Sequence, residues 1–179
     1  MPVQEANADA TPYGRYVTSD GWFVHNLAEA LAVRLARGGA LYPLEPREAP
    51  FPEIGVNVRV LWPGEANALY HAEDAQEGFL VLSGECLLIV EEEERALRPW
   101  DYFHCPAGTR HVLVGTGAEP CTVLMIGARS ASESLLYPVS KLAAEHGASV
   151  VHETTDPDEA YADWPQGFEP IQLAWPPTA

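Results

Sequence analysis

Basic residues are scarce in this chain of 179 residues, which has ten lysines and arginines against 26 aspartates and glutamates. The formal net charge is therefore −16 with histidine counted as neutral. Nucleic acids and anionic membranes are bound through clustered lysine and arginine that neutralise phosphate. The shortage of such residues argues against both as partners.

Cysteine is also scarce, with Cys86, Cys105 and Cys121 far apart and no Cys-x-x-Cys pair among them. This pattern predicts neither a disulfide framework nor a zinc ribbon, and we interpret all three as reduced, partly buried thiols. The sequence has no apolar run long enough for a membrane helix, and residues 1–7 lack the basic and apolar regions of a signal peptide. We therefore expect a soluble, cytoplasmic protein.

Glycine and proline are plentiful, with 14 and 16 copies, and they separate short apolar runs. Runs of this kind lie at 56–61, 79–82, 86–90, 102–105, 111–114 and 122–126. Short strands separated by Gly/Pro turns, with no helices between them, are typical of an antiparallel barrel or sandwich. Because 47% of the residues are apolar, the chain can also bury a hydrophobic core. The predicted fold class is all-β.

The two ends of the chain differ from this strand-rich middle. Residues 1–15 are polar and are expected to form a flexible N-terminal arm, whereas 16–129 are expected to form the barrel. A Leu/Ala-rich stretch that ends near residue 36 reads as a short helix. Residues 130–179 are expected to form a helical and extended C-terminal appendage, packed on the barrel or on a dimer partner.

Two blocks of the middle region carry residues that bind metal ions. In the first block, His71 and Glu73 are two residues apart, so their side chains project from the same face of an extended chain, and Glu77 follows at the same parity. In the second block, 106–110 form a tight turn that leads into a new strand at His111. Imidazole and carboxylate groups are ligands of divalent transition metals, and two carboxylates would neutralise the charge of the ion.

These blocks resemble the motifs of the cupin family, G-x5-H-x-H-x3/4-E-x6-G and G-x5-P-x-G-x2-H-x3-N. Glu77 and Gly84 match the end of the first motif, with the required six-residue gap between them. Pro106, Gly108 and His111 match the centre of the second motif. The strand pattern of the middle of the chain is compatible with this resemblance.

The chain departs from the cupin motifs at four positions. Glu73 stands where the first motif has its second histidine, and Gly64 lies one residue too far from His71. Trp100 takes the place of the glycine of the second motif, and Gly115 takes that of its asparagine. The first departure exchanges one metal ligand for another and changes the expected metal preference, whereas the others affect turns.

The resemblance implies a double-stranded β-helix, also called a jelly-roll or cupin barrel, with short flanking helices at the C-terminus. It implies a pocket that holds a divalent transition metal ion on His71, Glu73, Glu77 and His111. This ligand set does not select among zinc, Fe(II), manganese and nickel. Near the second motif, His104 and Tyr102 are candidates for a catalytic acid or base, although His104 could equally be a packed histidine on the other face of its strand.

Other interpretations of the two blocks stay open at this point. Some cupins hold no metal, and Arg59 or Arg110 could neutralise the two glutamates in place of an ion. Burying those carboxylates without any partner would cost several kcal/mol each. The acidic run Glu91–Glu94 is interpreted as a solvent-exposed hairpin turn rather than as a cation site.

The function that we expect is that of a small metalloenzyme whose ion binds a small organic molecule with a carboxylate or carbonyl group. The ion would act as a Lewis acid or activate oxygen, and dioxygenase, isomerase and lyase reactions are all compatible with this ligand set. The alternative is a non-catalytic binding or sensing cupin, in which the metal holds a ligand or staples the barrel. Because homodimers are common among cupins, the resemblance also implies a homodimer.

Overall fold

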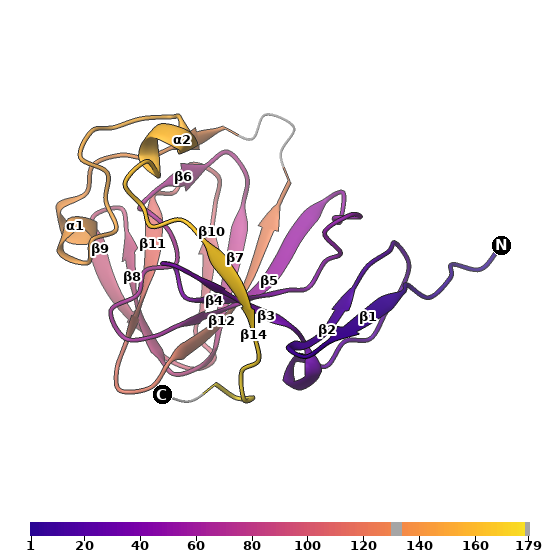
Figure 1. Cartoon of the computed structure of the whole chain (residues 1–179). Helices are drawn as coiled ribbons and strands as arrows, with labels where there is room; N and C mark the ends of the chain where they lie inside the picture. Colours follow the sequence, from indigo (N-terminus) through magenta and orange to yellow (C-terminus); the bar gives the residue numbers. More distant parts are fainter. Residues whose placement is uncertain (130–133, 178–179) are drawn as a thin grey trace.

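The protein is built around two antiparallel sheets that form a barrel (Figure 1), in a computed structural model that describes residues 1–129 and 134–177. The larger sheet contains, in spatial order, β10 (Tyr102–Cys105), β7 (Glu77–Ser83), β12 (Cys121–Ala128), β5 (Ile54–Leu61), β4 (Ala40–Pro43), β3 (Ala32–Leu35) and β14 (Phe168–Ile171). The smaller sheet contains β11 (His111–Thr116), β8 (Glu85–Val90) and β9 (Glu93–Leu97). The predicted all-β jelly-roll fold is confirmed.

The main hydrophobic core lies between the two sheets. Phe79 and Val81 of β7 and Val123 of β12 point inward from the larger sheet, and they meet Leu88 of β8 and Leu113 of β11 from the smaller one. Each of these side chains is at most 3% exposed. Full burial of such a side chain contributes roughly 1.5–3 kcal/mol, so this cluster is a major source of the stability of the barrel.

Strand β5 is covered on both faces, and this determines which of its residues face the barrel interior. Val58 and Val60 pack outward into a second apolar cluster with Tyr42 of β4. The ring of Trp175, near the C-terminus, lies edge-on to that of Tyr42 with their centroids 5.7 Å apart. Because side chains alternate along a strand, the residues between the two valines and on either side of them are directed into the barrel.

The N-terminal segment forms a hairpin that projects from the barrel (Figure 1), made of β1 (Ala8–Thr11) and β2 (Gly14–Val17). Most of residues 8–15, the second half of the predicted arm, are therefore paired in strands. The flexibility of that arm stays a prediction.

The Leu/Ala-rich stretch before residue 36 is not a helix, and the prediction of one was wrong. It forms a single 3-10 turn, η1 (Leu27–Glu29), and then enters the larger sheet as β3. Strand β3 pairs with β4 on one side and with β14 on the other. The hydrogen bonds and side-chain packing of two ladders outweigh the helix propensity of alanine and leucine, which is small per residue.

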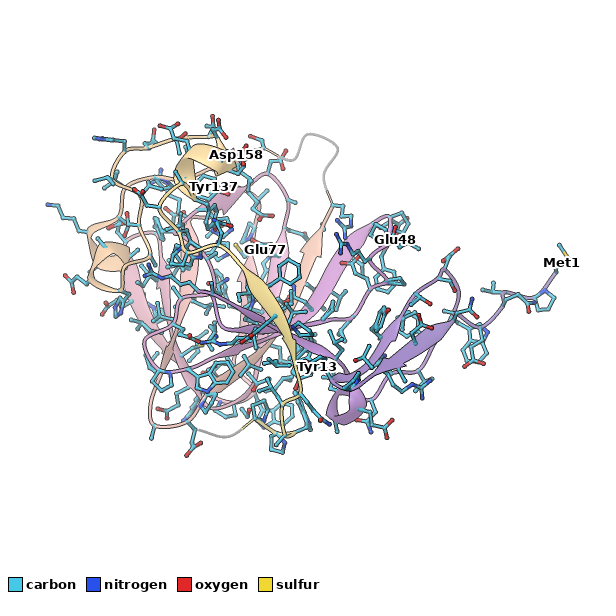
Figure 2. All side chains as sticks on the ribbon, viewed as in Figure 1. Met1, Tyr13, Glu48, Glu77, Tyr137 and Asp158 are labelled. Carbon is cyan, nitrogen blue, oxygen red and sulfur yellow. The ribbon has the colours of Figure 1, made fainter. Side chains whose placement is uncertain are left out.

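The C-terminal segment covers one end of the barrel. The predicted appendage begins with residues 130–133, which lie outside the described residues. After them, β13 (Leu135–Leu136) pairs with β6 (Ala72–Glu73), and the short helices α1 (Lys141–Glu145) and α2 (Pro157–Ala160) follow. Figure 2 shows Tyr137 of this segment at the same end of the barrel as Glu77. No helix in the described ranges is long and apolar enough to span a membrane.

Candidate metal centre

Two histidines that are distant in the sequence lie side by side at this end of the barrel. His71 and His111 form an isolated antiparallel bridge. The backbone N–H of His71 donates to the carbonyl of His111 at 3.2 Å, and the N–H of His111 donates to the carbonyl of His71 at 2.8 Å. These reciprocal bonds hold the two imidazoles together, with their centroids 5.0 Å apart.

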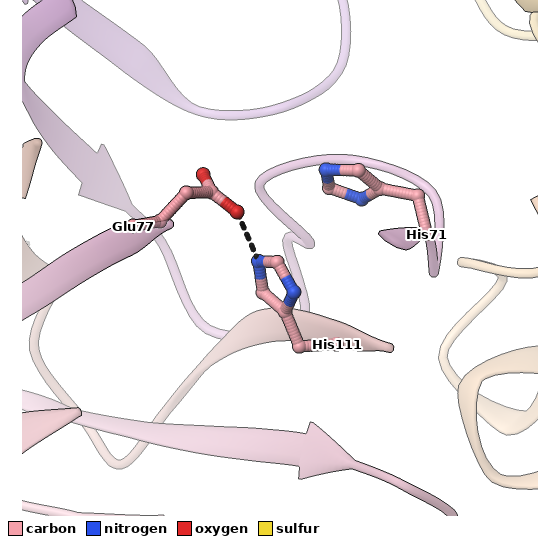
Figure 3. A group of neighbouring side chains, drawn as sticks. All are labelled: His71, Glu77 and His111. Atoms are coloured by element: carbon pink, nitrogen blue, oxygen red, sulfur yellow. Dashed lines mark ion pairs between the residues drawn. The ribbon is translucent and has the colours of Figure 1, made fainter. Parts of the chain in front are cut away.

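Glu77 completes a compact group with these histidines. It is the first residue of β7, and its neighbours β10 and β12 hold that strand on both sides. Figure 3 shows its carboxylate directed toward His111, with His71 close by. One ligand atom from each of the three residues lies within 4.8 Å of the others. The side chains of Glu77 and His111 are only 14% and 1% exposed, so the group is shielded from water.

Glu73 lies beside this group rather than within it. Its Oε1 atom is 3.4 Å from Nε2 of His71, and its side chain is 33% exposed. The backbone carbonyl of Glu73 accepts a hydrogen bond from the N–H of Gly108, which joins β6 to the turn before His111. The structure therefore places His71, Glu77 and His111 together and Glu73 next to one of them.

Backbone carbonyls determine which nitrogen of each histidine faces the carboxylates. Nδ1 of His71 lies 2.7 Å from the carbonyl oxygen of Leu69, and Nδ1 of His111 lies 3.1 Å from that of Thr109. A carbonyl oxygen can only accept, so each Nδ1 carries the proton. In the neutral ring, Nε2 then presents its lone pair, as in histidines that bind metals.

The resulting contacts bring hydrogen-bond acceptors face to face. Nε2 of His111 lies 3.3 Å from Oε2 of Glu77, and Nε2 of His71 lies 3.4 Å from Oε1 of Glu73. Oε2 of Glu77 and Nε2 of His111 are both buried without a hydrogen-bond partner. Such a pair requires either a shared proton or a cation between its atoms. Two ligands held about 2.1 Å from one ion lie roughly 3.0–3.4 Å apart for bond angles between 90° and tetrahedral, so a divalent transition metal fits this donor set.

Neither arginine considered from the sequence neutralises the glutamates. The Nη1 group of Arg59 donates to the carbonyl of Gly38 at 2.9 Å. Arg110 is exposed, and its backbone N–H bonds to the side chain of Glu91. Among the ion pairs of the described residues, the partners of Glu73 and Glu77 are histidines.

Burial shifts the pKa values of Glu77 and His111 in opposite directions. Burial, together with the negative charge of Glu73, raises the pKa of the Glu77 carboxyl to about 7. Burial lowers the pKa of the His111 ring to about 4, and the neighbouring His71 acts in the same direction. At neutral pH the His111 ring is therefore uncharged, and Glu77 without a metal is partly protonated.

For His71 and Glu73, hydrogen bonding outweighs the effect of burial on the pKa. Burial alone would lower the pKa of His71, but its contacts with Glu73 and with the carbonyl of Leu69 raise that pKa overall. The same contact with His71 lowers the pKa of Glu73. Glu73 is therefore ionised at neutral pH.

His71, Glu73 and Glu77 line a cavity of about 370 Å³. Four parts of the chain contribute its polar lining: strand β5, residues 67–77, the residue after β12 and the C-terminal segment. The polar side chains are those of His71, Glu73, Glu77, Asn57, Arg59, Asn67, Arg129, Tyr137 and Tyr161. The volume lies at the lower end of the range for small-molecule sites.

Two tyrosines of the C-terminal segment are part of this site, although no motif in the sequence points to them. The ring of Tyr137 stacks on His71 and meets that of Tyr161 edge-on. The hydroxyl of Tyr161 accepts a hydrogen bond from the N–H of Leu69, whose carbonyl accepts from His71. Burial raises the pKa of both phenols, so both are neutral donors. No local pattern indicates these contacts, because they depend on how a distant segment packs.

The structure does not bring Tyr102 and His104 to the cavity. Both side chains are exposed on the outer face of β10, and Tyr102 is 63% exposed. The alternate residues Phe103 and Cys105 point inward, and Sγ of Cys105 lies 3.4 Å from Nδ1 of His111. An acid–base role for Tyr102 and His104 therefore has no geometric support. Cys105 contacts the protonated side of the ring, and burial raises the pKa of its thiol to about 12, which agrees with a packing role.

Comparison with known proteins identifies the central region of the chain. The model of the cupin domain matches residues 57–127. This region contains the whole donor set and most of both sheets. A search of curated proteins finds no match.

Several solved structures are similar in fold. A predicted oxalate decarboxylase from Thermotoga maritima is 17% identical over 60% of this chain and 100% of its own, with a TM-score of 0.54. The polyketide cyclase RemF from Streptomyces resistomycificus is 14% identical over 60% of this chain and 79% of its own, with a TM-score of 0.52. A candidate sugar phosphate isomerase from Acidithiobacillus ferrooxidans is 24% identical, with a TM-score of 0.48; the match covers 55% of this chain and 64% of that one, slightly less than two thirds. Residues 57–127, the part of the chain that holds the donor set, form a cupin domain.

Proposed function

We propose that this cupin binds one divalent transition metal ion through His71, Glu77 and His111, with Glu73 as a fourth ligand, and acts on a small organic molecule in the adjoining cavity. The observation that carries this proposal is the pair of acceptor-to-acceptor contacts at 3.3 and 3.4 Å, of which the more buried has no hydrogen-bond partner on either atom. A cation removes the repulsion in both contacts at once, whereas a proton can relieve only one of them.

A bound ion would act as a Lewis acid that polarises a carbonyl or carboxylate oxygen of the substrate. The chain itself supplies the other functions of the site. The hydroxyl of Tyr161 accepts from the N–H of Leu69 and retains its own proton, which it can donate to a molecule in the cavity. Phe79 and Met125 supply apolar lining that limits the access of water.

The proposed metal site does not by itself select one reaction. Two histidines with carboxylates suit zinc, Fe(II), manganese and nickel alike, so the donor set does not select one ion. The two similar structures with the higher TM-scores are a polyketide cyclase and a predicted oxalate decarboxylase. Because these are different reactions, dioxygenase, isomerase and lyase chemistry all remain candidates for this chain.

Metal analysis of the protein tests the proposal. The untagged chain is purified without chelator, and its metal content is measured by mass spectrometry beside that of His111→Ala and Glu77→Gln. We expect about one equivalent of a transition metal in the wild type and far less in both variants. His104→Ala is the matched control, because it removes an exposed histidine from the outer face of β10. Unchanged metal content in His111→Ala and Glu77→Gln would overturn the proposal.

The alternative is a metal that only staples the barrel, or one that holds a ligand without turnover. A structural ion has all its positions filled by protein, whereas a catalytic ion keeps one open. Three of the four proposed ligands line the cavity, which supports an ion that a small molecule can reach. Displacement of a metal-bound water by small carboxylates, measured with Co(II)-substituted protein, distinguishes a reachable ion from a closed one.

The assembly and location of the protein stay predictions. The resemblance to cupins supports a homodimer, and light scattering on the full chain after gel filtration measures it. A monomer at all concentrations would contradict that prediction. The cytoplasmic location is tested by fractionation of cells that express the untagged chain.

A further inference from the structure

Arg59 places a positive charge in the same cavity as the proposed metal. It lies on β5 with Asn57, and both line the cavity because Val58 and Val60 of that strand face the outer cluster. One of its five donors is bonded, from Nη1 to the carbonyl of Gly38. Its Nε group is buried and has no hydrogen-bond partner. The guanidinium is therefore held by a hydrogen bond at Nη1 and lacks a hydrogen-bond partner at Nε.

Arg59 differs in this respect from three other arginines of the chain. Arg34, Arg95 and Arg129 each form an ion pair with a glutamate. No ion pair of Arg59 occurs among the described residues, although the chain has 26 acidic residues. Burial lowers the pKa of Arg59, but a guanidinium still remains charged at neutral pH. Folding the chain thus leaves a cation poorly hydrated and without a counter-charge, which is unfavourable unless something else pairs with it.

The charges of the cavity favour an anion as that partner. With a divalent ion bound, the carboxylates of Glu73 and Glu77 balance the charge of the metal. Arg129, the other arginine of the lining, is already paired with Glu45 at 2.7 Å. The phenols of Tyr137 and Tyr161 stay neutral, because burial raises their pKa. One positive charge, that of Arg59, is left over.

A second unpaired group lies close to Arg59 along the strand. Oδ1 of Asn57 is buried and has no hydrogen-bond partner. The hydroxyl of Tyr161, which is close enough to Arg59 to affect its pKa, keeps a proton to donate. A guanidinium, an amide and a phenol are together suited to bind an oxyanion and a neighbouring hydroxyl.

We propose that Arg59, with Asn57 and Tyr161, forms a subsite for the carboxylate or phosphate group of a small-molecule ligand, so that the molecule bound in this cavity is an anion. The subsite itself is independent of the metal. Only the further statement, that the same molecule also reaches the ion, rests on the proposed function. A purely structural Arg59 would serve only to anchor the Gly38 carbonyl, and it would leave anion binding unaffected when replaced.

The first experiment observes Arg59 in the wild-type protein, so it does not depend on the folding of a variant. The chain has nine arginines, and their side-chain Nε–H signals are recorded by ¹⁵N–¹H correlation NMR. Arg59→Lys assigns the Arg59 signal by its disappearance. Succinate, inorganic phosphate and the neutral analogue succinamide are titrated in turn. We expect a saturable shift of the Arg59 signal with succinate or phosphate and none with succinamide.

The second experiment measures affinity in variants. Arg59→Gln removes the charge, and we expect its affinity for the effective anion to fall at least about tenfold, the size of a charge-assisted hydrogen bond. Arg59→Lys retains the charge and should bind more strongly than Arg59→Gln. Arg129→Gln is the matched control, because it removes a cavity arginine that is already paired, and it should bind within about twofold of the wild type.

Both experiments are run on chelator-treated and Zn(II)-loaded protein, which separates the two proposals. Anion binding at Arg59 in chelator-treated protein supports the subsite even if zinc fails to bind. Zinc binding without any shift of the Arg59 signal, or with equal anion affinity in Arg59→Gln, overturns the subsite and leaves the metal proposal standing. Equal shifts of the Arg59 and Arg129 signals would also overturn it, because they would indicate unspecific binding. The stronger of the two anions identifies the group as carboxylate or phosphate.

Discussion

The phenol ring of Tyr137 lies stacked on the imidazole of His71, with the ring centroids 5.9 Å apart and 27° between the ring planes. Tyr137 is 4% exposed, and its ring also meets that of Tyr161 edge-on. A residue of the C-terminal segment is thus in direct contact with a proposed metal ligand of the cupin domain. The segment after the barrel is a wall of the site and supports the orientation of the histidine.

Replacement of Tyr137 should weaken the metal centre from outside the ligand set. Tyr137→Ala removes the ring that restrains His71, and we expect a loss of about tenfold in zinc affinity, as for other residues that orient metal ligands. The lost packing should also lower the free energy of unfolding by about 3 kcal/mol. Competition with a chromophoric chelator measures the affinity, and urea denaturation measures the stability.

Tyr137→Phe is the control for this prediction. It keeps the stacked ring and removes only the hydroxyl, so its zinc affinity should stay close to that of the wild type. If Tyr137→Ala bound zinc as tightly as the wild type, the C-terminal segment would have no part in holding His71.

The two glutamates should contribute unequally to metal binding. The Glu77 side chain is 14% exposed and belongs to the compact group, whereas that of Glu73 is 33% exposed, pairs with His71 and lies outside the group. We expect Glu77→Gln to weaken zinc binding more than about a hundredfold and Glu73→Gln about tenfold. Isothermal titration of both variants under the same buffer conditions makes the comparison. Equal losses would mean that Glu73 is a full ligand, and a larger loss in Glu73→Gln would contradict the ranking.

Much of the barrel could be predicted from the sequence because its strands are defined locally. Short apolar runs that end at Gly/Pro turns correspond to β5, β7, β8, β10, β11 and β12. The placement of His71 and Glu73 on one side follows from the two-residue repeat of an extended chain. The same repeat could have shown that His104 points outward, since the buried Cys105 is its neighbour.

The remaining features depend on contacts between distant parts of the chain. Strand β3 was predicted to be helical, since its pairing with β14 cannot be seen in the local sequence. Tyr137 and Tyr161 carry no motif and join the site only through the packing of the C-terminal segment. Arg59 was considered only as a counter-charge for the glutamates, because its unpaired Nε becomes apparent only in the folded protein.

The two glycines of the cupin motifs should differ in their tolerance of a side chain. Gly84 and Gly108 both have positive φ, at 68° and 81°. A Cβ atom at Gly84 would lie 2.2 Å from the carbonyl oxygen of Pro120, whereas one at Gly108 would have no neighbour within 4 Å. Gly108→Ala should therefore cost only the backbone strain of about 1–2 kcal/mol. Gly84→Ala should cost clearly more, because backbone must also move.

Thermal and urea denaturation of the two alanine variants tests this difference. Both substitutions add the same methyl group at a left-handed position, so each serves as the control for the other. Equal destabilisation of the two variants would contradict the close approach between Gly84 and the carbonyl oxygen of Pro120.

The stability of the metal-free protein should respond to pH through Glu77. The pKa of this carboxyl is raised to about 7, above the value of about 4.3 for an unfolded chain. Between these values the folded state binds a proton that the unfolded state has already released, so this group makes the free energy of unfolding fall as the pH rises. Below the lower value and above the upper one, its contribution no longer changes with pH.

Glu77→Gln isolates this effect, because glutamine does not titrate and its amide can donate to Nε2 of His111. The pKa of His111 is lowered to about 4, and its opposite contribution is present in both proteins and cancels in the comparison. In chelator-treated protein, the free energy of unfolding of Glu77→Gln minus that of the wild type should rise by about 3 kcal/mol at most between pH 4.5 and pH 7. Urea denaturation across this range measures the difference. Zinc should reverse this dependence on pH, because the ion needs the ionised carboxylate and stabilises only the wild type. If the stability difference between Glu77→Gln and the wild type did not change with pH in the metal-free protein, Glu77 would not hold a proton in place of the ion.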